Sequence, residues 1–190
     1  MSKVQCGGIN MIKLDQLAKI LADFKVYYDS PEGQQHVRLI ETEKKDVHAL
    51  MKKLSEMDRN SSEFVELVLY GLLPYSKSKY AKRVSLYSAF LNIKLFFRSY
   101  NYTEDDWKKI ANRIFNFCLN FQQNPDQLPE LINEFVNDKY SRRFQCGSIT
   151  PILYCINDNY PVINNRVKWT YAEIMRILGK KDEIQQKLMY

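Results

Sequence analysis

The stretch "TEDDWKKIANRIFNFCLNF", residues 103–121, has the clearest structural pattern in the chain. Thr103 lies three residues before Asp106, which is the spacing of a capping box, where the two side chains satisfy free backbone N–H groups at a helix start. Apolar residues then recur at the spacing of one helix face. They are Trp107, Ile110, Ala111, Ile114, Phe115, Cys118 and Phe121. The stretch therefore predicts an amphipathic helix that begins after Thr103 and buries one face.

Shorter apolar repeats predict further helices before this stretch. Their ranges are 14–24 and 44–57, separated by a break at "DSPEG", residues 29–33. Asn60 is the expected N-cap of the next helix, because Glu63 lies at capping-box distance. Gly71 and Pro74 are expected to end that helix.

After the stretch, "NPDQLP" at residues 124–129 predicts a turn, and residues 131–136 predict a short helix. Thr170 is the expected N-cap of a later helix, with Glu173 three residues on and Gly179 as its stop. The last ten residues, "KDEIQQKLMY", begin one more expected helix.

Two segments fit both helix and strand. Residues 78–100 are rich in β-branched and aromatic residues, yet their apolar spacing favours a helix. Residues 149–156 read as a buried helix or strand closed by a turn at 157–159. The prediction is a mainly α fold, a single helical domain over residues 1–190 that leaves room for a small β element, with 1–60 as a candidate N-terminal helical subregion.

Composition indicates a folded protein of the cytoplasm. Hydrophobic residues make up 45% of the chain and charged residues 26%, which is typical of globular domains and not of disorder. No apolar run is long enough to cross a membrane, and "MSKVQCGGINMIKL" has no signal-peptide core. The four cysteines form no C-x-x-C pair and are expected to be reduced thiols. They are Cys6, Cys118, Cys146 and Cys155.

The residues needed for common catalytic centres are sparse. Only His36 and His48 could serve a Ser-His-Asp or Cys-His site, and neither lies near a nucleophile motif. The chain has no P-loop and no grouped metal ligands, and the nuclease spacing D/E-x-K occurs without an upstream Pro-Asp. We therefore predict no enzyme activity, no cofactor and no metal site in this chain.

Positive charge is concentrated in one segment of a chain whose net charge is +6. No Asp or Glu occurs between Glu66 and Glu104, where tyrosine and phenylalanine alternate with lysine and arginine. The basic residues of this segment are Lys77, Lys79, Lys82, Arg83, Lys94 and Arg98. Such a local positive field predicts a polyanionic partner, because phosphates attract Lys and Arg and release counterions on binding.

Two further basic groups follow along the chain. The first consists of Lys139, Arg142 and Arg143, and the second of Arg166, Lys168, Arg176, Lys180 and Lys181. Asn164, Asn165 and Arg166 are also residue types that make bidentate contacts to base edges. Spacing alone favours a simple turn for these three residues, because Asn side chains often bond their own backbone.

The phrase "YPVINNR", residues 160–166, carries a family resemblance. With the apolar segment before it and a helix that ends near Leu178 and Gly179, it resembles the region that precedes the AAA+ module of McrB-type restriction proteins. "VSLYSAFLNIKLFFRSYNYTEDDW", residues 84–107, resembles the part upstream. The resemblance covers the C-terminal part of the chain, and residues 1–70 lie outside it. Within the phrase, Val162 and Ile163 are expected to anchor the turn to the core.

McrB-type proteins join a DNA-recognition domain to a GTP-hydrolysing AAA+ motor and act with a separate nuclease subunit. The resemblance implies that this chain is such a recognition domain of a phage-defence system, for a modified base or a specific site in double-stranded DNA, methylated or not. The motor and the nuclease would be its further partners. If a base is flipped, Tyr102, Trp169 and Tyr171 are the candidate stacking residues.

Two other functions fit the same residues. In a helical protein-interaction or scaffolding domain, the aromatic residues would be core and the basic segment a solvated face. A small helical enzyme of the glycosylase type would also handle flipped bases, but it needs a catalytic Asp or Lys that no motif identifies.

Overall fold

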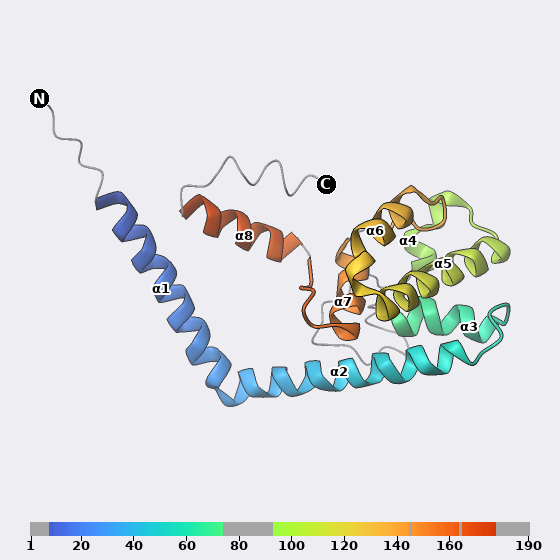
Figure 1. Cartoon of the computed structure of the whole chain (residues 1–190), viewed down its shortest axis with the longest axis horizontal. Coiled ribbons are helices and arrows are strands. Elements are labelled where there is room, and N and C mark those ends of the chain that lie inside the picture. The colour runs from blue at the N-terminus through green and yellow to red at the C-terminus, as the bar shows by residue number, and fades with distance from the viewer. Residues whose placement is uncertain (1–7, 74–92, 145, 164, 178–190) are drawn as a thin grey trace, which may run out of the picture. The chain divides into compact units, whose positions relative to one another are not determined.

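Every regular element in the described part of the chain is a helix (Figure 1). The computed structural model describes residues 8–73, 93–144, 146–163 and 165–177. The chain divides into two compact units, of which unit 1 comprises Met1–Val37 with Asn164–Tyr190, and unit 2 comprises Arg38–Ile163. The prediction of a mainly α fold is confirmed, and both segments that also fitted a strand are helical where they are described.

The elements are short helices apart from three long ones. In chain order they are α1 (Gly8–Asp29), α2 (Pro31–Ser55), α3 (Ser62–Glu66), the π-helical turn η1 (Leu67–Leu72), α4 (Ile93–Phe96), the 3-10 turn η2 (Arg98–Tyr100), α5 (Glu104–Gln123), the 3-10 turn η3 (Pro125–Gln127), α6 (Leu128–Asn137), α7 (Cys146–Ile156) and α8 (Asn165–Ile177).

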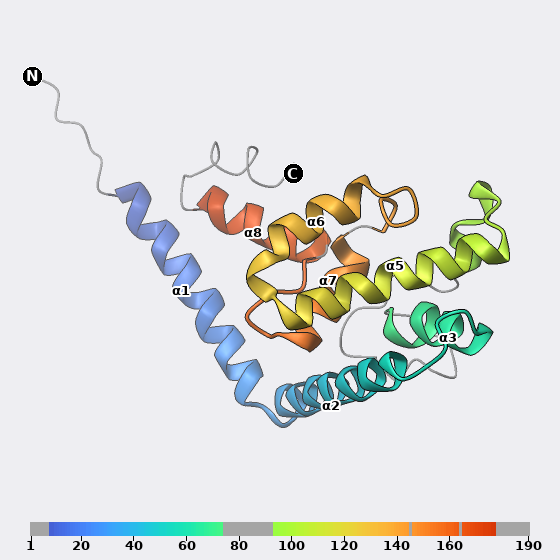
Figure 2. The ribbon, with the colours of Figure 1, turned by 45° about the vertical axis from the view of Figure 1, so that its right-hand side comes forward.

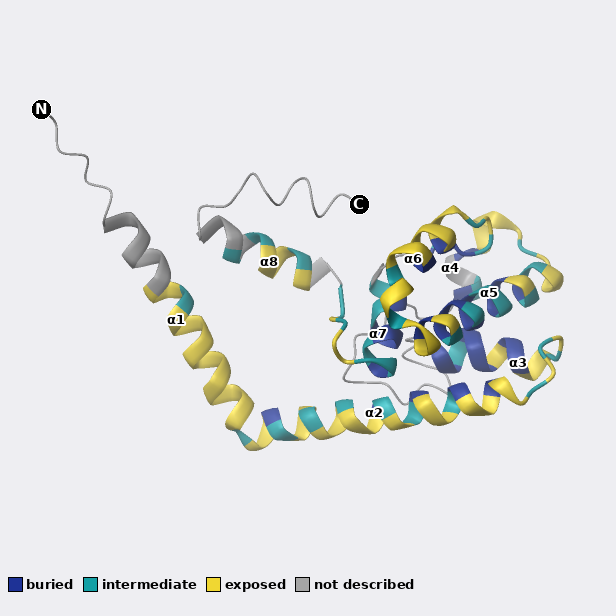
Figure 3. Ribbon diagram, in the orientation of Figure 1, coloured by how far each residue is buried: buried dark blue, intermediate teal, exposed yellow. Residues whose placement is uncertain are grey.

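Helix α5 is the centre of unit 2. It contacts α3, η1, η3, α6 and α7, and Figures 1 and 2 both show it between α3 and α6. The seven apolar residues predicted to form its face are all buried, and Phe117 is buried as well. Figure 3 shows this buried side continuing into α3 and η1. Burial of this stripe is a large apolar contribution to unit 2, since burying one large side chain stabilises a fold by about 1.5–3 kcal/mol.

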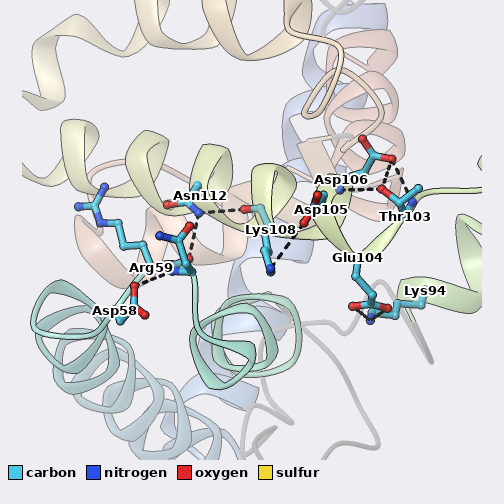
Figure 4. A network of polar contacts seen from close by, with 10 residues as sticks. Asp58, Arg59, Lys94, Thr103, Glu104, Asp105, Asp106, Lys108 and Asn112 are labelled. Carbon is cyan, nitrogen blue, oxygen red and sulfur yellow. Dashed lines mark hydrogen bonds and ion pairs between the residues drawn. The ribbon is translucent and has the colours of Figure 1, made fainter.

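The predicted capping box starts α5. The Thr103 hydroxyl accepts a hydrogen bond from the Asp106 backbone N–H, and the Asp106 carboxylate accepts one from the Thr103 N–H at 3.0 Å (Figure 4). These bonds from the Thr103 backbone and side chain lower the pKa of Asp106. The carboxylate is therefore charged at the positive end of the helix dipole, which favours negative charge there.

We expect Thr103→Ala to lower the free energy of unfolding by about 1 kcal/mol, the usual cost of losing an N-cap. Because the folded state depresses the pKa of Asp106, its contribution is present above the unfolded pKa of about 3.9 and is lost as pH falls through the lower folded value. The difference in free energy of unfolding between wild type and variant should therefore be smaller in acid. Urea unfolding at neutral and acidic pH measures both values; a gap that stays constant would contradict the role of Asp106.

A polar connection joins the segment before α3 to α5. Arg59 donates to Asn116 at 2.8 Å and lies over the Phe115 ring at 5.1 Å. In return, the Asn112 side chain donates to the Arg59 carbonyl at 3.2 Å, as Figure 4 shows. These contacts hold the connection between α2 and α3 against α5, at the edge of its buried face.

Lys44 fixes the unit 2 part of α2 to the turn after α7. Its ammonium donates to Glu41 at 2.7 Å and to Asp158 at 3.0 Å, and it lies 5.1 Å from the centre of the Tyr154 ring. The hydrogen bond to Glu41 raises the pKa of Lys44, so the group stays charged although its side chain is largely covered. Val47, Met51 and Leu54 then bury the adjoining face of the helix.

Several expected boundaries are wrong. Helix α2 begins at Pro31, far before residue 44, because proline fits the first helical position, where no N–H is needed. The N-cap of α3 is Ser61 and not Asn60, since the Ser61 hydroxyl accepts from the Phe64 N–H. Gly71 does not end that helix, because η1 continues to Leu72 and buries Gly71. Pro74 lies outside the described residues.

Boundaries later in the chain also differ. Helix α6 begins at Leu128, before residue 131, and again has proline in its first turn. Thr170 is not an N-cap, because α8 begins at Asn165 and runs through it. The turn at 157–159 is confirmed, with the Asn157 side chain accepting from the Asn159 N–H at 3.1 Å. Gly179 and the expected helix at 181–190 lie outside the described residues.

In unit 1, α1 contacts α8, and α1 meets the first turn of α2 at a tight corner. The Ser30 hydroxyl donates to the Tyr27 carbonyl and accepts from the Gly33 N–H. Gly33 is buried there, and a Cβ on it would lie only 2.1 Å from the Tyr27 oxygen. The corner therefore requires glycine for space, because backbone atoms fill the position of any side chain.

Gly33→Ala is accordingly expected to destabilise the corner by about 1–3 kcal/mol, the range for forcing an extra methyl group into a packed site. Gly147→Ala in α7 is the matched control, because nothing lies within 4 Å of its Cβ position. Limited proteolysis around residues 27–34 measures the effect. If proteases cleave the two variants equally slowly, the corner would accommodate the extra methyl group without a loss of stability.

Candidate nucleic-acid interface

The predicted basic residues of unit 2 that the structure describes lie on two segments that contact each other. Phe97, buried beside η2, packs against Phe144 with ring centres 5.0 Å apart and against Trp107 at 6.5 Å. Phe144 ends the connection between α6 and α7. This aromatic packing brings Arg98 and the pair Arg142–Arg143 into one neighbourhood, although they are distant in sequence.

Hydrogen bonds hold the connection after α6 in shape. Asp138 accepts from the Tyr140 N–H at 2.8 Å, and the buried Ser141 hydroxyl donates to the Phe135 carbonyl. Phe144 is buried at the end of the same segment. Arg142 and Arg143 lie between the buried residues Ser141 and Phe144. Arg142 is exposed and Arg143 is half-buried.

Arg143 lies over the first ring of a series of three aromatic residues, called here the aromatic ladder. Its guanidinium carbon is 3.5 Å from the centre of the Tyr100 ring, and Tyr100 stacks on Tyr102 at 5.9 Å. Tyr102 in turn meets the edge of Trp107 at 5.3 Å. Asn101 adopts φ 50° between the two tyrosines, a left-handed conformation that Asn tolerates better than most residues. The close contact with Tyr100 holds the guanidinium in place.

One hydrogen-bond donor of the Arg143 guanidinium has no partner. Its Nε is buried without a hydrogen-bond partner, as is the Nε of Arg113. Arg113 nonetheless lies 3.7 Å from Glu134 and 4.0 Å from Asp138, whereas no ion pair joins Arg143 to an acid among the described residues. A guanidinium that is held in place without a carboxylate partner suits an anion that accepts two hydrogen bonds, such as phosphate.

Two lysines gather around Tyr140 next to this ladder. Lys139 lies 4.6 Å and Lys109 5.7 Å from the centre of the Tyr140 ring. The polar contact with the Tyr140 side chain raises the pKa of Lys139, so its ammonium stays charged. We call the whole group the basic-aromatic surface. It comprises Arg98, Tyr100, Lys109, Lys139, Tyr140, Arg142 and Arg143.

The acidic residues in the first turn of α5 have partners of their own. Glu104 binds Lys94 at 3.0 Å, Asp105 lies 3.5 Å from Lys108, and Asp106 caps α5, as Figure 4 shows. Within the described residues, no ion pair involves the five cations of the basic-aromatic surface. Asp106 interacts electrostatically with Lys109 and Lys139, and Asp138 with Lys139. Because the surface carries five cations, these two acids leave it positive.

The remaining predicted site residues lie outside the described residues, in unit 1, or within the aromatic ladder. Lys77, Lys79, Lys82, Arg83 and Asn164 lie outside the described residues. Asn165 and Arg166 are the first two residues of α8 in unit 1, which also carries the half-buried Lys168. Trp169 is 76% exposed and Tyr171 47% exposed on the same helix, so both rings are accessible for stacking, whereas Tyr102 is partly buried in the ladder.

The phrase that carries the family resemblance is anchored within unit 2 up to Ile163. Tyr160 donates to the Pro125 carbonyl at 3.0 Å and packs edge-on against Phe121. The Ile163 N–H donates to the Thr150 hydroxyl at 2.8 Å, and Val162 packs against the core. The expected anchoring by Val162 is confirmed, while Ile163 is held mainly through its backbone.

Sequence patterns missed Lys109 and Tyr140. Lys109 lies on the polar face of α5, where the sequence suggests only a solvated charge, and Tyr140 stands in an irregular segment. The one local signal was the position of Tyr140 between Lys139 and Arg142, an aromatic residue within a basic group.

Neither a metal site nor a membrane span is found in the part of the chain that the structure describes. There, no three His, Cys, Asp or Glu side chains gather in a way that could hold an ion, and no helix combines the length and apolarity needed to cross a membrane. Cys118 and Cys155 are buried thiols outside any disulfide. No family model, curated protein or solved structure matches this chain.

Proposed function

We propose that this chain is a DNA-binding module, the targeting domain of a McrB-type restriction system that recognises a modified base or a specific site in double-stranded DNA. The observation that carries the proposal is Arg143, stacked on Tyr100 beside Arg98 and Arg142 without an acidic partner among the described residues. The phrase at residues 160–166 supports the assignment to this family.

The chemistry of the basic-aromatic surface fits a phosphate backbone. Half or more of protein–DNA hydrogen bonds go to phosphate and sugar, and they position the protein without reading sequence. Arg143 supplies a fixed planar donor, while Lys109 and Lys139 supply flexible point charges around Tyr140. Base reading then falls to other residues, for which Asn165, Arg166 and Trp169 on α8 are the candidates.

A targeting role also accounts for the missing catalytic groups. A recognition domain needs phosphate contacts and a few base readers, whereas GTP hydrolysis and DNA cleavage belong to a motor and a nuclease subunit. On this proposal the chain itself is not an enzyme and holds no cofactor.

The decisive experiment is a mobility-shift series with methylated and unmethylated duplexes between about 50 and 200 mM salt, over which phosphate-dependent binding falls steeply. We expect binding at low salt and a preference for one duplex. Charge removal at Lys79, Lys82 and Arg83 should weaken binding to all duplexes alike, because such contacts carry no sequence information. Absence of binding at low salt would refute the proposed function.

A second candidate function is a protein-interaction module without nucleic-acid binding. The exposed apolar side chains of α1, which no phosphate contact would use, favour it. The same mobility-shift series separates the two, because an interaction module would bind none of the duplexes.

A further inference from the structure

Helix α1 carries large apolar side chains that are open to solvent. We define the α1 stripe as the residues that recur there at helical spacing, namely Leu17, Ile20, Leu21, Phe24, Tyr27 and Tyr28. Leu17 is partly buried, and the exposed fractions of the other five run from 42% for Tyr27 to 61% for Phe24. Residues 18–29 of α1 are all exposed, and Figure 3 shows the described part of this helix as mostly exposed. A continuous exposed patch of this kind marks an interaction site in a soluble protein.

The stripe is narrow and uncharged. At 3.6 residues per turn, its six members fall within an arc of about 120° around the helix. Lys19, Asp23 and Lys25 fall outside that arc, and Val26, which is 73% exposed, lies on the opposite side. The stripe therefore presents only apolar atoms and tyrosine hydroxyls, which excludes a phosphate backbone and favours another apolar helix as its partner.

The area available suits the pairing of two such helices. Side chains of this size, half exposed, offer about 100 Å² each, so the stripe offers about 500 Å². Two stripes in contact would remove about 1,000 Å² from water, which reaches the lower limit of a specific protein interface.

The stripe is complementary to itself in antiparallel orientation. Leu21 then lies opposite Phe24 of the other helix, and Leu17 opposite Tyr28, so these two layers each join an aliphatic side chain to a larger aromatic one. Antiparallel pairing also opposes the two helix dipoles, which favours this orientation.

We propose that a second copy of this chain docks on the α1 stripe, and that the protein forms a symmetric dimer in solution through α1. A two-fold interface of this kind uses the same patch on both copies. The dimer does not depend on nucleic acid, so the test of the dimer is independent of the test of the proposed DNA binding.

Sedimentation velocity of the full 190-residue chain without DNA tests the proposal at micromolar concentrations. Wild type should sediment as a dimer that dissociates on dilution. Phe24→Asp should abolish the dimer, because a carboxylate would be buried without a partner in the interface. Val26→Asp is the matched control, since it adds the same charge on the opposite side of the same helix and should leave the dimer intact.

Circular dichroism shows whether both variants keep the helical content of wild type, so that loss of the dimer is not loss of the fold. A monomeric wild type at high concentration would overturn the proposal and leave the stripe to another partner. Equal dissociation by Phe24→Asp and Val26→Asp in folded proteins would overturn it as well, because the stripe would then have no special part in association.

Discussion

Replacing Phe115 with alanine is expected to lower the free energy of unfolding by about 3–5 kcal/mol, a large part of the stability of an ordinary domain. Phe115 is fully buried in the centre of α5 and meets the Phe64 ring edge-on at 5.5 Å. Arg59 covers the same ring. The substitution would leave a cavity where α3 and α5 pack, and it would also remove the aromatic surface that holds Arg59.

Urea unfolding followed by circular dichroism measures this loss. Ile132→Ala in α6 is the control, because Ile132 is 43% exposed and its truncation leaves no enclosed cavity. We expect the control to change stability by less than about 1 kcal/mol. If the two substitutions cost the same, α5 would not be the centre of the core of unit 2.

The second large effect concerns the basic-aromatic surface. Removing the charges of Arg98 and Arg142 with Arg98→Gln and Arg142→Gln is expected to weaken DNA binding about tenfold for each arginine, the worth of a hydrogen bond to a charged group. The slope of log affinity against log salt should fall by about one for each arginine that binds a phosphate, and all duplexes should be affected alike. Fluorescence anisotropy over a salt series measures both quantities.

Lys45→Gln with Lys52→Gln is the matched control, since both lysines are exposed on α2 and the pair removes the same charge. A general loss of positive charge would weaken binding equally in both double variants. In that case the basic-aromatic surface would not be the contact surface. If wild type binds DNA and only the arginine variant loses binding, the contact is local.

The most regular segments were predictable because their signals are local. The start of α5 depends on two residues three positions apart, and its buried face follows from the helix period alone, so both the capping box and the buried stripe are confirmed. Cys118 was expected on that face and is buried there. Such features need no information from the rest of the chain.

Boundaries were less predictable, because several residues compete for the same role. Asn60 and Ser61 are both good caps, and the structure uses Ser61, whose hydroxyl accepts a hydrogen bond from the Phe64 N–H. The Asn60 backbone N–H instead donates to the Asp58 carboxylate. Pro31 had the pattern of a helix break, yet it starts α2. Thr170 had the pattern of an N-cap, yet it lies inside α8. Packing of the apolar face beyond each residue outweighs these weak local preferences.

By itself the sequence determined a helical fold, because helix period and capping act over three or four residues, and it located three basic groups. It could not show that Arg143 lies on Tyr100, that Arg98 shares this neighbourhood, or that Lys109 of α5 joins Lys139 at Tyr140. The two arginine pairings arise where Phe97 and Phe144 are buried against each other. Local spacing sets which atoms a helix exposes, whereas burial of distant apolar side chains decides which exposed atoms meet.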